Sequence, residues 1–356
     1  MPPYPRTCAH YSANMQSVLH VGPVNTEGGM ATVIRILHEN PPQGWRASTL
    51  STHCNGNVVK KYLKWRKSFI EFKKVLSNTQ LRPDVVHIHC ASDWSWWRKR
   101  RILKYAINKH SVPCVMHIHS GKFSTWLDEN PKRIIRINEA LDSPLVTTAV
   151  LSDYWKGILG EKIGEVVVAD NPIDPRIMIT KGEKTANVER DELLKDNTKT
   201  ILMMGRNDPI KGHAFAIELF QRVRKKIAKI KLNITGYDGE TGEAINSLGW
   251  VSEDNKRALL ESADVLLVPS KYEGQPMVII EALSCGLPVI CSDNIPPTPS
   301  SVVRARGNDI DDWESKLINI LNEPPSSNQI ISDSQPHQLE NVRNNWLQIY
   351  STALSK

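Results

Sequence analysis

The sequence lacks several features that would place it in a class at once. Its six cysteines form no CxxC pair, so no zinc site is predicted and a reducing compartment is expected. It has no run of about 18 apolar residues, the minimum for a membrane-spanning helix. The opening segment, MPPYPRTCAHYSANMQ, has no basic head followed by an apolar stretch, so no signal peptide is predicted. We therefore expect a cytoplasmic protein.

The length and composition predict a globular protein with two domains. The chain has 356 residues, of which 40% are hydrophobic and 23% are charged. One hydrophobic core rarely grows beyond about 250 to 300 residues, so a second core is expected.

Short apolar runs alternate with longer stretches of helical periodicity, as in parallel βαβ units. We expect strands at residues 17–21, 85–90, 114–118, 146–151 and 165–169, and again at residues 200–204, 231–235, 264–269 and 288–292. The fold class is therefore α/β, with doubly wound domains at residues 1–175 and 198–335. Residues 176–197 are the expected linker, and a last helix near 338–356 is expected to pack back on the first domain.

Positive charge is concentrated in the first half of the chain. Residues 1–175 contain 23 Lys and Arg against 14 Asp and Glu. The tracts KKYLKWRKSFIEFKK (60–74) and WSWWRKRRILK (94–104) mix this charge with aromatic residues. Such a mixture suits an anionic lipid surface or a nucleic acid, and the alternative is an ordinary solvated helix face.

The most informative stretch is EGQPMVIIEALSCGLPVICSD at residues 273–293. Pro276 suits the first turn of a helix and Gly286 its end, so a helix is expected at about 276–285. Glu273 then precedes the helix and Glu281 lies inside it, near the carboxyl end of a strand, where α/β sheets bind ligands. Free N–H groups after Gly274 would attract an anionic or oxygen-rich ligand. The alternative is two ordinary surface acids.

A second motif, GRNDPIKG at residues 205–212, follows the first strand of the same domain. A diphosphate needs fixed positive charge, which Arg206 offers as a planar fork and Lys211 as a point charge. Read alone, the motif could equally be a basic loop.

Together these residues resemble glycosyltransferase family 4. The resemblance rests on GRNDPIKG, on NITG (233–236), on LGWV (248–251), and on the two glutamates followed by ALSCGLPVICSD. It implies the GT-B fold, in which two Rossmann-like domains face each other across a cleft. It also implies a retaining, metal-independent hexosyltransferase of polysaccharide or lipopolysaccharide assembly, with no cofactor beyond a nucleotide-sugar donor, UDP-sugar being favoured. The acceptor would be a glycan or a lipid-linked glycan.

The resemblance also assigns roles to individual residues. Arg206 and Lys211 would bind the diphosphate, Glu281 the ribose hydroxyls, and Glu273 would face the donor sugar as a catalytic residue with His119. The other implied donor-binding residues are Gly28, Gly29, Trp250, Val251, Gly274, Gln275 and Pro276.

Two His-x-His pairs, His87/His89 and His117/His119, lie in or just after predicted strands. Alternation along a strand puts both members of a pair on one face. A metal site is not predicted, because a third ligand with recognisable spacing is missing. The resemblance instead matches His119 to an active-site histidine, and leaves His87, His89 and His117 as packed or acceptor-side residues.

The chain departs from the family pattern after Asp293. A Gly-rich loop with an acid is usual there, but this sequence continues NIPPTPSSVVRARGNDIDDW. The order Gln275, Pro276, Met277 also replaces the more common aromatic-Gly pair, which could alter sugar preference.

Several rival functions fit the same residues. A DNA-modifying glucosyltransferase would explain the basic first half, although nucleic acid is not the expected partner. An epimerase or phosphorylase would need no separate acceptor, and a catalytically silent GT-B scaffold would need no nucleotide. The basic and aromatic tracts favour peripheral contact with the inner face of a membrane.

Overall fold

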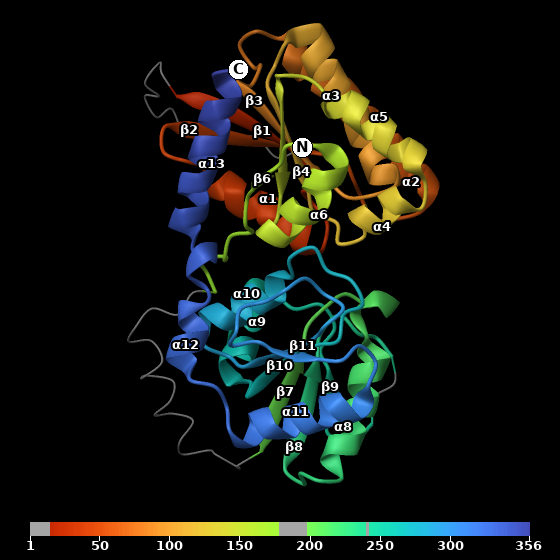
Figure 1. Ribbon diagram of the computed structural model, residues 1–356, viewed down its shortest axis with the longest axis vertical. Helices are drawn as coiled ribbons and strands as arrows, with labels where there is room; N and C mark the ends of the chain where they lie inside the picture. The colour runs from red at the N-terminus through yellow and green to blue at the C-terminus, as the bar shows by residue number, and fades with distance from the viewer. Residues whose placement is uncertain (1–14, 178–197, 240–241) are drawn as a thin grey trace, which may run out of the picture.

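The computed structural model describes residues 15–177, 198–239 and 242–356 (Figure 1). The expected linker, 176–197, lies outside the described residues apart from its first two positions. The described chain forms two units, each built on a six-stranded sheet in which all the strand pairs are parallel.

The first sheet has the order β2-β1-β3-β4-β5-β6. Its strands are β1 (Gln16–Gly22), β2 (Trp45–Ser51), β3 (Val85–Cys90), β4 (Cys114–Ile118), β5 (Val146–Val150) and β6 (Val167–Val168). The connecting helices are α1 (Gly29–Glu39), α2 (Val58–Ser77), α3 (Trp94–His110), α4 (Phe123–Asp128), α5 (Pro131–Leu141) and α6 (Asp153–Ile163).

Alternate strand residues build two separate cores on this sheet. Leu19 and Ile88 share a core with α2 to α6, whereas Val18 and Val85 share one with α1 and the last helix, α13 (Leu339–Leu354). A sheet covered on both faces explains the nearly continuous apolar runs in its central strands.

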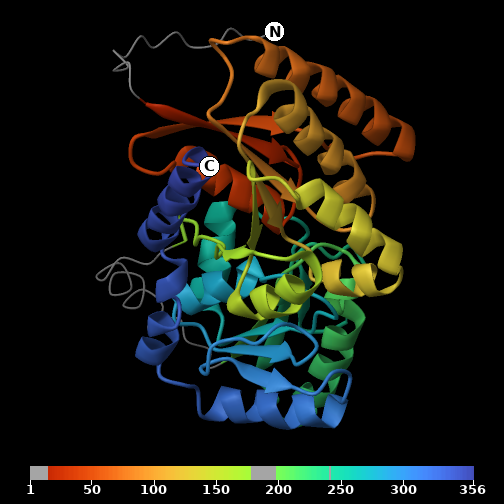
Figure 2. The same ribbon diagram turned by 45° about the horizontal axis from the view of Figure 1, so that its top comes forward.

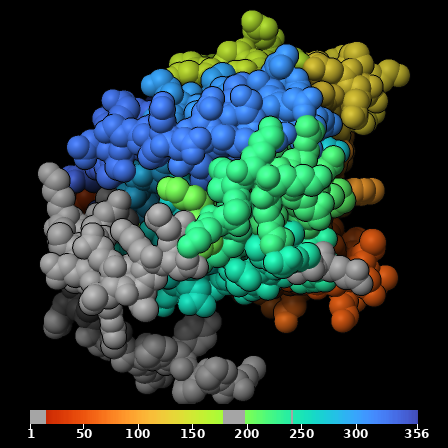
Figure 3. Space-filling view, turned by 90° about the horizontal axis from the view of Figure 1, so that it is seen from below, coloured from red at the N-terminus to blue at the C-terminus, as the bar shows by residue number. Residues whose placement is uncertain are grey.

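The second sheet has the order β12-β11-β10-β7-β8-β9. Its strands are β7 (Lys199–Met203), β8 (Ile230–Ile234), β9 (Ile245–Ser247), β10 (Val265–Val268), β11 (Val289–Ser292) and β12 (Val303–Ala305). Helices α8 (His213–Arg224) and α11 (Ile310–Asn322) pack on one face and lie side by side (Figure 3). Helices α9 (Glu253–Ser262), α10 (Met277–Ser284) and α12 (Ser327–Ser332) cover the other.

The chain ends by returning to the first unit. Figure 2 shows α13 beside the first sheet, far in sequence from the strands it covers. Trp346 and Tyr350 of α13 are buried there, and the Tyr350 hydroxyl lies 2.8 Å from Nδ1 of His87. The last helix is therefore part of the core that Val18 and Val85 share with α1.

The predicted fold class is confirmed, and the differences are confined to sheet edges. Sequence reasoning missed β2, β9 and β12, and it extended β6 to residues 165–169. All four are edge strands. An edge strand has one neighbour and needs less apolar surface, so it leaves a weaker pattern in the sequence.

Candidate functional site

A cleft of about 560 Å³ lies between the two units and is lined by both. This volume suits a small-molecule ligand. All the site residues predicted from the sequence line it: Gly28, Gly29, His119, Arg206, Lys211, Trp250, Val251, Glu273, Gly274, Gln275, Pro276 and Glu281. Most stand at or after the carboxyl ends of strands, which meet at one edge in a parallel sheet.

Lys211 is held at the cleft by its local structure. The side chain of Asp208 accepts from Ile210 N at 3.0 Å and starts the single 3-10 turn that Lys211 ends. Lys211 Nζ contacts Glu273 Oε1 at 2.5 Å. The two predicted residues thus form an ion pair, so an entering anion would share the ammonium with Glu273.

Arg206 faces the first unit across the cleft. A Cβ added to Gly28 would lie 3.9 Å from Arg206 Cδ. The Arg206 side chain is 55% exposed, and its guanidinium lies 3.8 Å from the Asp208 carboxylate. This cation is therefore accessible to a ligand.

Glu281 is buried in the wall of the cleft, with 1% of its side chain exposed. Its Oε1 accepts from Lys256 Nζ at 2.8 Å, whereas Oε2 has no hydrogen-bond partner among the described residues. Burial raises the pKa of the Glu281 carboxyl, and Lys256 opposes that shift. A buried oxygen without a donor is costly, so a ligand hydroxyl would satisfy it.

Lys256 was missed by sequence reasoning. It lies on α9, lines the cleft and also contacts Glu253 at 2.8 Å. Burial alone would lower its pKa, but Glu281 and Glu253 raise it. The available signal was indirect: a buried glutamate needs a cation nearby, and a Lys in a charged helix is one of many candidates.

The two units meet backbone to backbone beside these residues. A Cβ on Gly121 would lie 2.1 Å from Glu273 O, and one on Gly274 would lie 2.2 Å from His119 O. Trp155 Nε1 also donates to Gly274 O at 2.6 Å. These contacts bring Glu273 and His119 to the same part of the cleft.

Gln275 contributes to the same contact. Its side-chain oxygen accepts from Asn171 N at 2.7 Å, and its side-chain nitrogen donates to Asp170 at 2.8 Å. The Gln275 amide thus ties the loop before α10 to the end of the first unit. Any contribution to donor binding would come from the parts of the residue that these bonds leave free.

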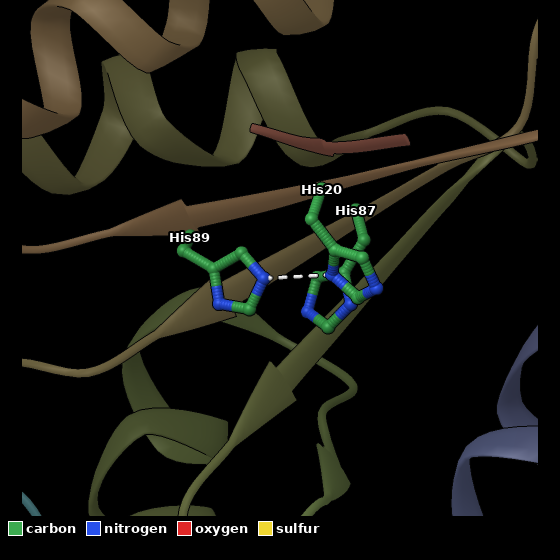
Figure 4. A group of neighbouring side chains, drawn as sticks. All are labelled: His20, His87 and His89. Atoms are coloured by element: carbon green, nitrogen blue, oxygen red, sulfur yellow. Dashed lines mark hydrogen bonds between the residues drawn. The ribbon is translucent and has the colours of Figure 1, made fainter. Parts of the chain in front are cut away.

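The four buried histidines of the sheet stand behind His119, on the face covered by α1 and α13. His119 Nε2 lies 3.0 Å from His89 Nδ1. His89 Nε2 in turn lies 3.1 Å from His20 Nδ1 (Figure 4). His87 and His117 form a further pair at 3.2 Å. His119 therefore leaves its Nδ1 for a ligand.

Burial lowers the pKa of His20 to about 3 and lowers that of His89 and His119, so these rings are neutral at pH 7. Ring nitrogens of His20, His87 and His89 lie within 4.8 Å of one another, as metal ligands would. Neutral imidazoles can also satisfy each other, because each offers one N–H and one lone pair. The His20–His89 hydrogen bond accounts for one short separation, and ring stacking brings His87 to a centroid distance of 4.0 Å from His89.

The Pro-rich tract after Asp293 stays away from the cleft. Residues 294–301 are described, and none of them lines it. Arg304 instead donates to the carbonyls of Asp293, Ile295 and Pro296 at 2.9 Å and holds the tract to its own sheet.

Comparison with known proteins adds to this geometry. Residues 185–336 match the family model described as glycosyl transferases group 1, which corresponds to the second unit. The sucrose-phosphate synthase of Thermosynechococcus elongatus superposes with a TM-score of 0.72 at 15% identity, over 96% of this chain and 99% of that one. The fold is therefore GT-B, and the matches support a GT-B glycosyltransferase.

Two curated relatives show the extent of the sequence similarity. The glycogen synthase of Mycobacterium tuberculosis is 26% identical over 246 residues, which are 63% of this chain and 55% of that protein. The UDP-Gal:alpha-D-GlcNAc-diphosphoundecaprenol alpha-1,3-galactosyltransferase of Escherichia coli is 25% identical over 270 residues, 70% of this chain and 66% of that protein. The chain thus spans about half the length of the first of these relatives. No helix among the described residues has both the length and the apolarity to cross a bilayer.

Replacing Gly274 by alanine should open the cleft. The new methyl group would overlap His119 O and lie 2.9 Å from Leu151 Cδ1, so the two loops must separate. Overpacking of this kind costs about 1–3 kcal/mol. We expect a larger radius of gyration in small-angle X-ray scattering. Gly160→Ala is the matched control, because a Cβ there meets nothing within 4 Å. Identical scattering from Gly274→Ala and the parent protein would show that the contact is not tight.

Proposed function

We propose that this chain is a retaining glycosyltransferase that moves a hexose from a nucleoside-diphosphate donor to a glycan or lipid-linked glycan acceptor. The observation that carries the proposal is the convergence of Arg206, Lys211, Glu273 and Glu281 on one cleft between two Rossmann-like units. The cationic side chains suit a diphosphate. A UDP-sugar is the first candidate donor, since the related Escherichia coli galactosyltransferase is named for UDP-Gal.

The donor would lie with its diphosphate between Arg206 and Lys211, near the N-terminus of α10. Glu281 Oε2 would accept from the ribose hydroxyls, which supplies the partner that this buried oxygen lacks among the described residues. The nucleobase would lie against Trp250 and Val251, both of which line the cleft. The sugar would then reach Glu273 and Nδ1 of His119.

In the proposed reaction, the acceptor hydroxyl attacks the anomeric carbon on the face that the diphosphate leaves. The bond from the anomeric carbon to the phosphate oxygen breaks, the bond to the acceptor oxygen forms, and the hydroxyl proton passes to the leaving phosphate. Arg206 and Lys211 stabilise the charge that grows on the diphosphate, so the step needs no protein nucleophile and no metal. Retention follows because attack and departure share one face.

We further propose that α2 contacts a membrane surface during acceptor capture. The first turns of α2 expose Val58 (81%), Val59, Tyr62 and Leu63. Basic residues stand between and after them: Lys60, Lys61, Lys64, Arg66 and Lys67. Apolar side chains exposed beside positive charge suit an anionic lipid surface better than a DNA duplex, which offers no apolar layer. This surface favours the lipid-linked acceptor over a DNA acceptor.

Lys211→Ala tests the diphosphate site. Loss of this ammonium should lower turnover of a nucleotide sugar by about 100-fold, equivalent to about 3 kcal/mol of transition-state stabilisation. Lys271→Ala is the control, since Lys271 is exposed, bonds Ile210 O through its backbone N–H and is not among the residues lining the cleft. Turnover of Lys211→Ala within about threefold of the parent would refute the assignment.

Glu281→Gln tests the ribose contact. The neutral amide should weaken UDP binding by about tenfold, the cost of a hydrogen bond to a charged group. Calorimetry with UDP and with 2′-deoxy-UDP should show that the parent distinguishes the two and the variant does not. Glu261→Gln is the control, since Glu261 pairs with Arg257 and is not a cleft residue. Unaltered discrimination in Glu281→Gln would argue against the ribose assignment.

Arg66→Glu with Lys67→Glu tests the membrane contact. Each basic residue near an anionic surface contributes about 1 kcal/mol, so losing two should weaken vesicle binding by about thirtyfold or more. Flotation with phosphatidylglycerol and phosphatidylcholine vesicles measures this. Lys225→Glu with Lys226→Glu, on the second unit, makes the same charge change elsewhere. Equal flotation of both double variants would show that α2 does not contribute to membrane binding.

A further inference from the structure

Lys99 is a buried cation in the cleft that pairs with no carboxylate among the described residues. It lies on α3, is 4% exposed and lines the cleft, and its Nζ donates to the Thr52 hydroxyl. Thr52 in turn donates to Gly22 O at 3.3 Å. The contacts of the ammonium are therefore neutral ones.

The surroundings of Lys99 are positive as well. We define the first-unit arm of the cleft by Thr52, His53, Trp65, Ser95, Arg98 and Lys99, all of which line it. None of these six is acidic. Arg98 donates through Nε to the Trp94 carbonyl at 3.1 Å. Partial burial lowers the pKa of His53, and the positive charges of Lys61, Arg98 and Lys99 lower it further. These three cations therefore all lie close enough to His53 to disfavour its protonation.

Two further groups in the arm lack their natural partners. The buried indole N–H of Trp65 has no acceptor among the described residues. Burial lowers the pKa of Lys99 to about 7, Cys90 opposes this shift, and Arg98 adds to it. Both groups are donors, and among the described first-unit residues that line the cleft the one acid is Glu27, which forms no ion pair with Lys99 or Arg98.

A charge buried in this way is unfavourable unless something compensates it, and the lowered pKa of Lys99 expresses that cost, because without a counter-ion the amine is only partly protonated at pH 7. Moving an ammonium out of water without a counter-ion costs several kcal/mol, and a hydroxyl partner recovers little of that. An apolar residue at position 99 would fill the same space at lower cost. A bound anion would supply the missing counter-charge.

We propose that the first-unit arm, through Lys99 and Arg98, binds a phosphoryl group carried by the acceptor. The inference rests on the proposed glycosyl transfer and specifies its acceptor as a phosphorylated one, such as a glycan on a lipid diphosphate. The donor diphosphate has its own cations, Arg206 and Lys211, on the second unit. The arm therefore serves a second anion in the same cleft.

The position of the arm fits an acceptor with a lipid tail. Trp65, which lines the arm, lies on α2, and the exposed Val58, Val59 and Leu63 occupy the preceding turns of that helix. A phosphoryl group held at Lys99 would leave its lipid near this apolar surface. An acceptor whose negative charge is the carboxylate of an acidic sugar would have no lipid, so it would not need the apolar surface of α2 beside the arm.

Calorimetry with inorganic pyrophosphate tests the proposal in the full-length Arg206→Ala/Lys211→Ala protein, where both donor cations are absent. We expect pyrophosphate to bind this protein, and Lys99→Met added to it to weaken binding by about tenfold or more, as for other charged hydrogen bonds. Arg98→Gln should weaken binding too, and it carries the test alone if Lys99→Met does not fold. Lys104→Gln is the control, because Lys104 is an exposed residue of α3 outside the cleft.

Any of three outcomes would overturn the proposal. It fails if pyrophosphate does not bind, if the Lys99 and Arg98 variants bind it as tightly as the protein in which they are made, or if glucuronate binds in place of pyrophosphate. Tighter binding of farnesyl diphosphate than of pyrophosphate would support a lipid-linked source, and equal binding would contradict it. UDP titration of the parent separates this inference from the proposed function. If UDP and other nucleoside diphosphates fail to bind while pyrophosphate binding still depends on Lys99, the transferase proposal fails and the anion site stands.

Discussion

The cleft depends on the close approach of two loops, one from each unit. Gly121 and Gly274 lie against the backbone carbonyls of Glu273 and His119, respectively, at separations that leave no room for a methyl group. Each loop therefore supplies a glycine to the other and a side chain, His119 or Glu273, to the cleft. A GT-B site is split between two domains, so its geometry is only as precise as this contact. Glycine is required at both places for space, since neither has a positive φ.

Charge is distributed unequally across the cleft. On the second unit, Lys211 pairs with Glu273, and Lys256 pairs with Glu281. On the first unit, Lys99 and Arg98 pair with no carboxylate among the described residues, although Glu27 also lines the cleft. Paired charges largely cancel and leave little attraction for a further anion, whereas unpaired cations attract an anion from outside. The difference suits a donor that brings both a diphosphate and hydroxyls, and an acceptor that brings negative charge.

The sequence was sufficient to predict the fold class, the central strands and several of the residues that line the second-unit side of the cleft. These predictions succeeded because buried parallel strands and strand-to-helix loops leave continuous local patterns. Lys256 and Lys99 could not be found in this way. Each lies in a helix rich in other charged residues, and burial, which no local pattern reveals, distinguishes it from its neighbours. The roles of Gly121 and Gln275 depend on contacts between segments more than 100 positions apart, which only the packed structure supplies.

Strand alternation predicts where the histidines lie, but it does not predict what they do. Alternation puts His87, His89 and His117 on one face of the sheet, and α13 covers that face, so the imidazoles are sealed from water. Neutral, hydrogen-bonded rings are stable there, whereas burial disfavours protonated rings because they carry a charge. His119, at the end of the chain of rings, is held by His89 and keeps a defined orientation at the cleft. The last helix of the chain thus reaches the cleft indirectly, because its Tyr350 bonds His87 and its Trp346 packs on the same rings.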